Sequence, residues 1–498
     1  MYVNVGKSRS REVGKSSSWS HVNTLVCETV TATTMAELRT ARDAVKDADL
    51  VELRLDGVGD LDVAGALAGR RRPVIVTCRP SWEGGKWNGF EAKRLEVLAE
   101  AIRLGAEYVD VEWRADRRSL PASDRTQQVL SHHDFHGVPP DLASRVRAMR
   151  AERPAVLKIA VSASRLSDCL ALRDALTGGR DHVAIAMGPT GQLTRLWPAW
   201  LGSRWMYGGS AAPGQVSTRE LIGSYRVRQT TATTRVFGLT GAPLGHSASP
   251  AMHNAAFAAL GLDAVYVPLE TSSAEEFLNV AREIRLEGAS VTAPLKESLF
   301  AHAAPADETT HQVQALNTLR RGPRGWEGRN FDIAGFLNPM ERRKVALTGK
   351  RAVVLGAGGG ARAAAFGLKQ RGASVEVSAR RLDRARGLAA AIGVAASVWP
   401  PAGGWDVLVN ATPVGTWPNA DASPLPREAM TGRLVYDLVY NPPETALLKS
   451  ARAAGIETIG GLEMLVAQAC LQCQWWTGVE APATVIDRAA RERLASGQ

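Results

Sequence analysis

The chain has 498 residues, which is too long for one hydrophobic core and suits roughly two to four domains. With 45% hydrophobic and 22% charged residues it has the composition of a globular protein, and no window reaches about 18 consecutive apolar residues, so we predict no membrane span. The net charge of +10 comes without a recognisable nucleic-acid-binding module, so we expect no nucleic-acid partner, whereas anionic small substrates and a phosphorylated cofactor suit a basic surface.

The first 22 residues are rich in Ser, Lys and Arg and contain almost no large apolar side chains. This composition predicts a disordered extension and lacks the apolar core of a secretory signal; an organellar transit peptide is the alternative. The five cysteines show no disulfide framework that would suggest secretion, and without a secretory signal we expect a cytoplasmic protein, with a plastid as the alternative. Cys470 and Cys473 have redox-motif spacing, but a four-ligand metal site needs more partners, and we expect a structural role and no metal.

Short apolar runs alternate with helix-like stretches over the first half of the chain. This alternation predicts parallel strands joined by crossover helices. The number of runs, eight in about 200 residues, is typical of a (β/α)8 barrel, although an open doubly wound sheet also alternates in this way. The expected strands are 25–30, 50–56, 73–79, 108–113, 127–135, 155–161, 182–188 and 205–209.

Two polar residues within these runs are candidates for catalysis. Lys158 lies in an apolar strand, where burial favours the neutral amine that attacks a ketone. A half-exposed lysine or one paired with Glu112 is the alternative. His133 offers a proton acceptor at a barrel mouth, but it is equally consistent with a solvated imidazole or one bound to Asp134.

The order of the motifs is more specific than either residue alone. ELRLD at 52–56, TCR at 77–79 with EGG at 83–85, DVE at 110–112, SHHDFHGVPP, LKIAV, AMGPTG and APGQ at 212–215 together resemble type I 3-dehydroquinate dehydratase. The resemblance covers residues 23–225 and implies a (β/α)8 barrel that dehydrates 3-dehydroquinate through a Schiff base.

This resemblance implies a role for each matching residue. Lys158 forms the imine, His133 moves the proton and Glu83 partners His133. Ala211 stands where many relatives have Ser or Thr, which puts one hydroxyl contact in doubt. The positions that match substrate contacts are Glu52, Arg54, Arg79, Arg195, which clamps the carboxylate, and Gln215.

Beyond a polar connection at 226–235, a second set of polar residues flanks short strands and helices. Ser247 and Ser249 precede a helix, and they either cap it or bind a carboxylate there. Lys296 follows an expected strand, Asn317 is expected on another, and Asp332 begins a helix. Lys296 and Asp332 form either a surface ion pair or, in a cleft, a proton-transfer pair.

A glycine-rich turn follows the apolar strand 351–355. Gly356, Gly358 and Ala361 satisfy G-x-G-x-x-G/A between a strand and a helix, which predicts a dinucleotide site because backbone amides reach a pyrophosphate there. The next strand, 374–378, ends in Arg380, Arg381 and, one turn on, Arg384, with no carboxylate. This favours the 2′-phosphate of NADP over NAD; a solvated basic turn is the alternative.

Together with DVLVNATPVGTWP, LVYDLVYNPPETALLK and GLEMLVAQACLQ, these motifs resemble shikimate dehydrogenase over residues 236–495. The resemblance implies a substrate lobe, a Rossmann lobe and a helical return, with Lys296 and Asp332 as the catalytic pair. The family commonly has N-T-D where this chain has Phe331 in the middle position, which implies altered packing or substrate preference. Substrate contacts fall at Ser247, Ser249, Thr292, Asn317, Tyr440 and Gln468, and cofactor contacts at Gly356, Ala357, Gly358, Gly359, Gly360, Ala361, Arg380, Arg384, Leu438 and Gly461.

We therefore expect an α/β protein that joins 3-dehydroquinate dehydratase to an NADP-dependent shikimate dehydrogenase, so that 3-dehydroshikimate leaves one site as the substrate of the other. A quinate or NAD-linked dehydrogenase and a non-catalytic ligand-sensing regulator are the alternatives. The oligomeric state is left open. The expected divisions are an extension at 1–22, the barrel at 23–228, the substrate lobe at 235–344, the Rossmann lobe at 345–455 and C-terminal helices at 456–498.

Overall fold

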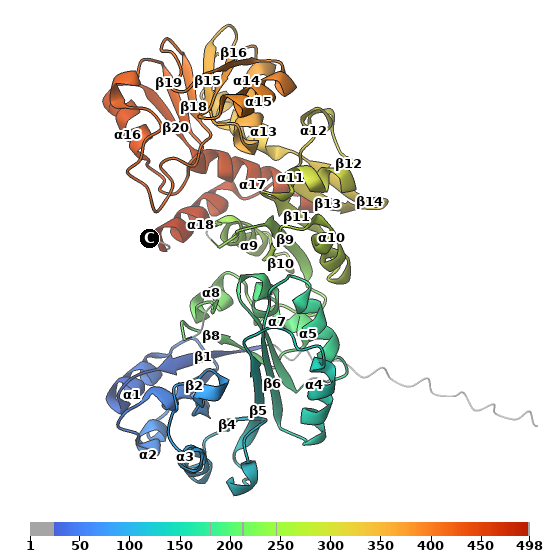
Figure 1. The fold of residues 1–498 in the computed structure, drawn as a ribbon, viewed down its shortest axis with the longest axis vertical. Coiled ribbons are helices and arrows are strands. Elements are labelled where there is room, and N and C mark those ends of the chain that lie inside the picture. Colours follow the sequence, from blue (N-terminus) through green and yellow to red (C-terminus); the bar gives the residue numbers. More distant parts are fainter. Residues whose placement is uncertain (1–23, 180, 212–213, 246, 497–498) are drawn as a thin grey trace, which may run out of the picture.

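The computed structural model describes residues 24–179, 181–211, 214–245 and 247–496. Its strands form three sheets, which succeed one another along the long axis of the molecule (Figure 1). The expected extension at 1–22 and residues 212–213 of the last barrel motif lie outside the described residues. Among the described helices, none is both long and apolar enough to cross a membrane.

The first sheet is a near-closed parallel barrel in the order β7-β6-β5-β4-β3-β2-β1-β8. The expectation of eight strands is confirmed, and the outer strands are joined where the N–H of Arg204 donates to the carbonyl of His182 at 2.8 Å. The barrel strands are β1 (Leu25–Thr31), β2 (Leu50–Arg54), β3 (Val74–Thr77), β4 (Tyr108–Glu112), β5 (Gln127–Asp134), β6 (Val156–Ser162), β7 (His182–Met187) and β8 (Trp205–Gly208).

Helices surround these strands because each crossover buries one apolar face against the barrel. The short segments η2 (Ser81–Glu83) and η4 (Pro189–Gly191) follow β3 and β7. The helices are α1 (Met35–Ala44), α2 (Val63–Leu67), α3 (Glu91–Arg103), α4 (Leu142–Ala151), α5 (Asp168–Leu176), α6 (Gln192–Leu196), α7 (Pro198–Leu201) and α8 (Thr218–Gly223).

The second sheet, in the order β10-β9-β11-β13-β14-β12, mixes parallel and antiparallel pairs. Its strands are β9 (Arg235–Gly241), β10 (Ala264–Glu270), β11 (Gly288–Val291), β12 (Ala304–Pro305), β13 (Thr318–Gly322) and β14 (Gly325–Arg329). Its helices are α9 (Ser249–Ala259), α10 (Ala274–Glu283), α11 (Leu295–Ser298), α12 (Glu308–Val313) and α13 (Phe331–Arg342). Asn317 was expected on a strand, but it lies just before β13, where its side chain is free to turn toward α13.

The third sheet is fully parallel in the order β17-β16-β15-β18-β19-β20, which is the Rossmann arrangement. Its strands are β15 (Arg351–Leu355), β16 (Ser374–Ser378), β17 (Ala395–Ser397), β18 (Val407–Asn410), β19 (Leu434–Asp437) and β20 (Glu457–Gly460). Its helices are α14 (Gly359–Gln370), α15 (Leu382–Ile392) and α16 (Ala446–Ala453). The chain then returns to the second sheet through α17 (Gly461–Thr477) and α18 (Ala483–Ser496), as Figure 1 shows in red.

The barrel and the second sheet share one hydrophobic core. Helix α6 packs on strand β10, which is the edge of the second sheet nearest the barrel. The connecting residues are held on both sides: Trp197 Nε1 donates to the carbonyl of Thr231 at 2.9 Å, and Arg226 Nη2 donates to that of Ala264 at 2.6 Å. The polar connection is therefore anchored to both halves.

Candidate active sites

The first cavity, about 340 Å³ in volume, opens among the carboxyl ends of the barrel strands. Parallel strands bring side chains from distant segments to this end, which is where TIM barrels carry their active sites. Every barrel residue with an expected role lines it: Glu52, Arg54, Arg79, Glu83, His133, Lys158, Arg195 and Gln215. Ala211 also lines it, so the family's hydroxyl at that position is replaced by a methyl group.

Lys158 is buried at this cavity, and its partners differ from the one considered from the sequence. Its Nζ lies 2.9 Å from Asp110 Oδ2 and 3.4 Å from Glu52 Oε1, and 4.3 Å from the centre of the Tyr207 ring. The alternative of a pair with Glu112 is wrong, because Glu112 faces Arg79 and Arg94. The amino group is thus held between two carboxylates and an aromatic face.

The carboxylates beside Lys158 belong to a buried charge network. Arg79 donates to Asp110 at 2.7 Å, to Glu112 at 2.6 Å and to Ser131 at 2.8 Å. Burial raises the pKa of Asp110, but the cations of Arg79 and Lys158 outweigh it and hold that pKa well below its ordinary value. Asp110 is therefore an anion, and sequence reasoning missed it as a site residue although it shares a strand face with Glu112.

His133 is paired with Glu83 and not with Asp134. Glu83 Oε1 accepts the backbone N–H of His133 at 2.8 Å and lies 3.0 Å from its Nδ1. Burial, with the nearby charge of Arg79, holds the pKa of His133 well below its ordinary value, so the imidazole is neutral. Burial also raises the pKa of Glu83 to about 7.

The two other arginines of the cavity differ in what they can bind. Arg54 makes a two-pronged pair with Asp56, both contacts being 2.9 Å. Arg195 is only 3% exposed, burial lowers its pKa to about 10, and its Nε and Nη1 have no hydrogen-bond partner within the described part of the chain. A buried guanidinium with open donors matches an anionic ligand.

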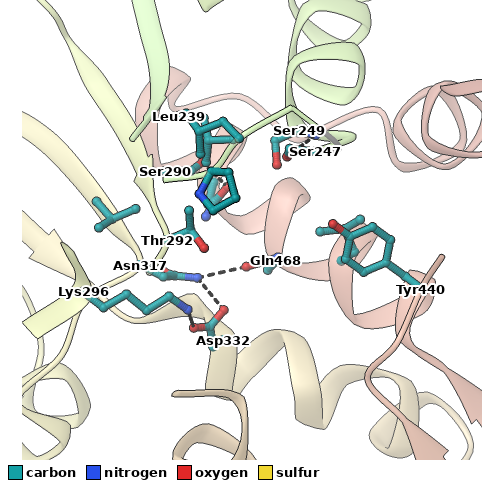
Figure 2. Close-up of a pocket in the computed structure, with 15 residues that line it drawn as sticks. Leu239, Ser247, Ser249, Ser290, Thr292, Lys296, Asn317, Asp332, Tyr440 and Gln468 are labelled. Atoms are coloured by element: carbon teal, nitrogen blue, oxygen red, sulfur yellow. Dashed lines mark hydrogen bonds and ion pairs between the residues drawn. The ribbon is translucent and has the colours of Figure 1, made fainter. Parts of the chain in front are cut away.

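The second cavity, about 270 Å³ in volume, lies between the second sheet and α17 (Figure 2). Lys296 forms an ion pair with Asp332 Oδ2, and Asn317 Nδ2 donates to Asp332 Oδ1 and to Gln468 Oε1, each at 2.9 Å. All the expected substrate contacts line it: Ser247, Ser249, Thr292, Asn317, Tyr440 and Gln468. Ser290 and Gln472 line it too and were missed as site residues, although Gln472 ends the motif GLEMLVAQACLQ.

The serines at this cavity do not cap the helix that follows them. The N-cap of α9 is Ala248, and no side chain there accepts a capping hydrogen bond. Ser247 Oγ accepts the N–H of Ser249 at 3.2 Å, and both hydroxyl groups border the cavity. The capping alternative is wrong, and the hydroxyls face the ligand space.

Phe331 points away from the second cavity. Its ring packs edge-on against Trp475 of α17, with centroids 5.7 Å apart, and it is 8% exposed. Only its backbone contributes near the site, where its N–H donates to Asn317 Oδ1 at 2.8 Å. Of the two expected effects, altered packing and altered substrate preference, the contacts of Phe331 support altered packing.

The third cavity, about 630 Å³ in volume, runs along the ends of β15 and β16. Its lining includes Gly356, Ala357, Gly358, Arg380 and Arg384. Gly356 has φ +110°, and a Cβ there would lie 2.8 Å from the carbonyl oxygen of Ala411, whereas a Cβ on Gly358 would meet nothing within 4 Å. The turn is therefore tight on its inner side and open toward the cavity, as a pyrophosphate requires.

Five expected cofactor residues are not among those that line this cavity: Gly359, Gly360, Ala361, Leu438 and Gly461. The first three begin α14, where unpaired backbone N–H groups point out of the helix. A Cβ on Gly360 would lie 3.3 Å from Leu438 Cδ1, and one on Gly461 would lie 2.3 Å from the Leu438 carbonyl oxygen. These glycines allow close packing of α14, β19 and α17 beside the cavity.

The second and third cavities are neighbours. A Cβ on Gly359 would lie 3.9 Å from Lys296 Cδ, so the stem of the lysine passes along the start of α14. A dinucleotide bound along the glycine turn would therefore lie close to the Lys296–Asp332 pair. Among the described residues, no group of three or more His, Cys, Asp or Glu side chains is arranged to hold a metal.

Comparison with known proteins agrees with this division. Residues 26–232 match the family model for type I 3-dehydroquinase, residues 239–319 that for the shikimate dehydrogenase substrate binding domain, and residues 461–491 that for the shikimate 5′-dehydrogenase C-terminal domain.

Three similar proteins illustrate the likeness. A bifunctional 3-dehydroquinate dehydratase/shikimate dehydrogenase of Arabidopsis thaliana, described as chloroplastic, is 31% identical over 92% of this chain and 83% of its own length. An NADP(+) shikimate dehydrogenase of Moorella thermoacetica is 39% identical over 53% of this chain and 96% of its own length. A solved shikimate dehydrogenase in complex with NADP+ superposes with a TM-score of 0.51 at 33% identity, covering 53% of this chain and 97% of that one. The chain therefore belongs to the family of bifunctional 3-dehydroquinate dehydratase/shikimate dehydrogenases.

Proposed function

We propose that the barrel dehydrates 3-dehydroquinate through an imine on Lys158 and that the second half reduces the product, 3-dehydroshikimate, to shikimate with NADPH. The observation that carries this proposal is that each substrate cavity contains one lysine whose amino group contacts carboxylates. Lys158 lies between Asp110 and Glu52, and Lys296 is paired with Asp332.

In the barrel, the charge around Lys158 suits an iminium ion. Loss of water from lysine and ketone gives a cationic nitrogen where the ammonium group was, and Asp110 and Glu52 stabilise either cation. The positive nitrogen makes the adjacent C–H acidic. The neutral imidazole of His133, held through Nδ1 by Glu83, takes that proton with Nε2 and returns it to the departing hydroxyl.

Substrate binding in the barrel falls mainly to Arg195, whose open guanidinium donors clamp a carboxylate. Arg54, Glu52 and Gln215 border the same space and contact the substrate hydroxyls. Arg79 is occupied by Asp110, Glu112 and Ser131, so it acts by keeping Asp110 ionised.

In the second half, Lys296 Nζ gives a proton to the C3 oxygen of 3-dehydroshikimate, and Asp332 orients the ammonium group. When bound, NADPH supplies the hydride. The hydroxyls of Ser247 and Ser249 hold the substrate carboxylate, and Asn317, Thr292, Tyr440 and Gln468 bind its hydroxyls and ring.

The third cavity fits NADP better than NAD. Arg380 and Arg384 border it where NAD enzymes place a carboxylate for the ribose 2′-hydroxyl, and Arg381 lies between them in sequence. Their guanidinium groups recognise a 2′-phosphate, and the amides at the start of α14 receive the pyrophosphate.

Borohydride trapping tests the imine. With 3-dehydroquinate present, borohydride should add substrate-derived mass to the peptide that contains Lys158 and not to that containing Lys86, which lines the same cavity. The Lys86→Met variant should still be trapped and Lys158→Met should not. Modification elsewhere with Lys158 untouched contradicts the proposal.

A coupled assay tests the two reactions in sequence. The purified protein should oxidise NADPH when given 3-dehydroquinate alone, whereas Lys158→Met should do so only when given 3-dehydroshikimate. No oxidation by the parent protein with 3-dehydroshikimate contradicts the dehydrogenase and favours a ligand-sensing regulator. Comparing turnover of shikimate and quinate with each cofactor separates the quinate or NAD-linked alternative.

The proposal includes a cytoplasmic location. It also includes the domain boundaries given above, with the barrel at 23–228, the substrate lobe at 235–344, the Rossmann lobe at 345–455 and the C-terminal helices at 456–498. The five cysteines are all free, which supports a reducing compartment. Cell fractionation tests the location, and recovery in a plastid, the compartment named for the Arabidopsis relative, contradicts it.

A further inference from the structure

The side chain of Asn317 uses all of its hydrogen-bonding capacity. Oδ1 accepts from the N–H of Phe331 and from Thr318 Oγ1, both at 2.8 Å. Nδ2 donates to Asp332 and to Gln468, both at 2.9 Å (Figure 2). A backbone N–H can only donate, so the Phe331 amide determines which end of the Asn317 side chain is oxygen.

From this anchor the direction of each further hydrogen bond follows. The single proton of the Thr318 hydroxyl goes to Asn317 Oδ1, so the hydroxyl oxygen must accept from its other neighbour, Gln472 Nε2, at 3.0 Å. Gln472 Oε1 then faces Ser290 Oγ at 2.8 Å and His253 Nε2 at 3.2 Å, and both must donate.

The buried end of this series of hydrogen bonds is His253, which is 0% exposed. Nε2 must carry a proton, and Nδ1 has no hydrogen-bond partner within the part of the chain that the structure describes. A second proton on Nδ1 would be a buried donor without an acceptor, so Nδ1 keeps a lone pair. Burial lowers the pKa of His253 to about 4, in agreement with a neutral ring.

We propose that Thr318 and Gln472 are positioning residues for the reduction, and that His253 in its neutral Nε2–H form begins a one-way hydrogen-bond chain that ends at Asp332. The chain runs through Gln472, Thr318 and Asn317, and every donor points toward the Asp332 carboxylate.

The physical consequence of this chain is a locked Asn317. If Thr318 lost its hydroxyl, Oδ1 would lose one of its two donors and would be held by the Phe331 N–H alone. The amide could then swing about that single bond, and Nδ2 would no longer hold the Asp332 carboxylate of the Lys296–Asp332 pair in one position. This inference rests on the proposed role of that pair in proton transfer.

Paired substitutions test the positioning role. Thr318→Val removes the hydroxyl at nearly constant shape, and kcat for NADP-dependent shikimate oxidation should fall roughly tenfold, the equivalent of one hydrogen bond, while the KM for NADP is unchanged. Thr318→Ser keeps the hydroxyl and should restore kcat to within about twofold. Gln472→Met leaves the Thr318 hydroxyl without its donor but able to donate to Asn317, so kcat should fall by less than in Thr318→Val. Equal losses in the Val and Ser variants, or no loss in the Val variant, overturn the proposal.

The dehydratase activity of each preparation reports whether the chain has folded, because it belongs to a separate cavity. Nitrogen-15 NMR of histidine-labelled protein gives a second readout that needs no turnover. The His253 signal, identified among nine histidines by its loss in His253→Gln, should show a protonated Nε2 and an unprotonated Nδ1. The opposite tautomer or an imidazolium overturns the direction of the chain. A parent protein without dehydrogenase activity but with this signal refutes the proposed function and the positioning role, and leaves the direction of the chain intact.

Discussion

Glu83 holds His133 at two points, accepting its backbone N–H at 2.8 Å and contacting its Nδ1 at 3.0 Å with the same carboxylate oxygen. When Glu83 is ionised, Nδ1 must carry the proton, and the lone pair of Nε2 is free for the substrate. When Glu83 is protonated it can donate to Nδ1, and the proton of the neutral ring then moves to Nε2. In the proposed mechanism, the protonation of Glu83 thus determines whether His133 can act as a base.

The dehydratase should therefore gain activity as the pH rises through the pKa of Glu83. Burial sets that pKa at about 7, so kcat/KM for 3-dehydroquinate should increase between pH 6 and 8. The Gln side chain in Glu83→Gln does not titrate, so this variant should not show the rise in kcat/KM between pH 6 and 8. Its activity at pH 8 should be about tenfold below that of the parent. The measurement is a pH profile of both proteins. If the rise in kcat/KM with pH persists in the variant, a group other than Glu83 is responsible for it.

The same carboxyl should make the stability of the barrel depend on pH. Its folded pKa, about 7, lies above the ordinary value of 4.5, so the favourable effect of the neutral carboxyl is complete below pH 4.5 and is lost as the pH rises through 7. The melting temperature of Glu83→Gln relative to the parent should thus be higher at pH 8 than at pH 5. A difference independent of pH would contradict the raised pKa. Glu96, which is exposed on α3, provides the matched control, Glu96→Gln.

Arg380→Ala should weaken the binding of NADP selectively. A guanidinium bound to a phosphate contributes about 1.5–3 kcal/mol, so the KM for NADP should rise at least tenfold while that for NAD changes little. Arg386 is also exposed on α15 but does not border the third cavity, so Arg386→Ala is the control. Steady-state kinetics with both cofactors test this prediction. Equal changes in the KM for NADP and for NAD would show that Arg380 does not bind the 2′-phosphate.

Glu276 joins the barrel to the substrate lobe. Its Oε1 accepts from the N–H and Oγ of Ser167 at 3.1 and 2.8 Å, and Oε2 accepts from Thr271 Oγ1 at 2.6 Å. Loss of these bonds in Glu276→Ala should cost about 1–3 kcal/mol and speed hydrogen–deuterium exchange around Ser167 and Thr271. Glu275→Ala, next to it and exposed, should change neither. Identical exchange in the two variants would show that this contact does not hold the interface.

Phe331→Thr, which restores the residue common in the family, should lower stability and spare substrate binding. The ring packs on Trp475 and is 8% exposed, so its loss should cost about 3 kcal/mol. The N–H bond to Asn317 remains, and the KM for shikimate should stay within about twofold. Calorimetry with kinetics on one preparation tests both parts. A large change in KM with unchanged stability would place the ring at the substrate.

The local patterns of the sequence determined the elements that carry the sites. Strands such as β6 and β15 are buried on both faces, so their sequences are runs of apolar residues and their positions could be predicted. The turn at Gly356 could also be predicted, because all the residues of its glycine motif are close together in the sequence. The family motifs identified Lys158, His133, Lys296 and Asp332, and the structure brings each pair to one cavity.

Which groups touch was decided only by the tertiary structure. Lys158 meets Asp110 and Glu52, which lie 48 and 106 residues away, because strand order and register bring β2, β4 and β6 to one barrel mouth. The chain through Thr318 and Gln472 joins residues 154 apart because α17 returns to the second sheet. Sequence periodicity specifies which face of an element is buried, whereas partners across the core depend on how the elements pack, and no local pattern contains that information.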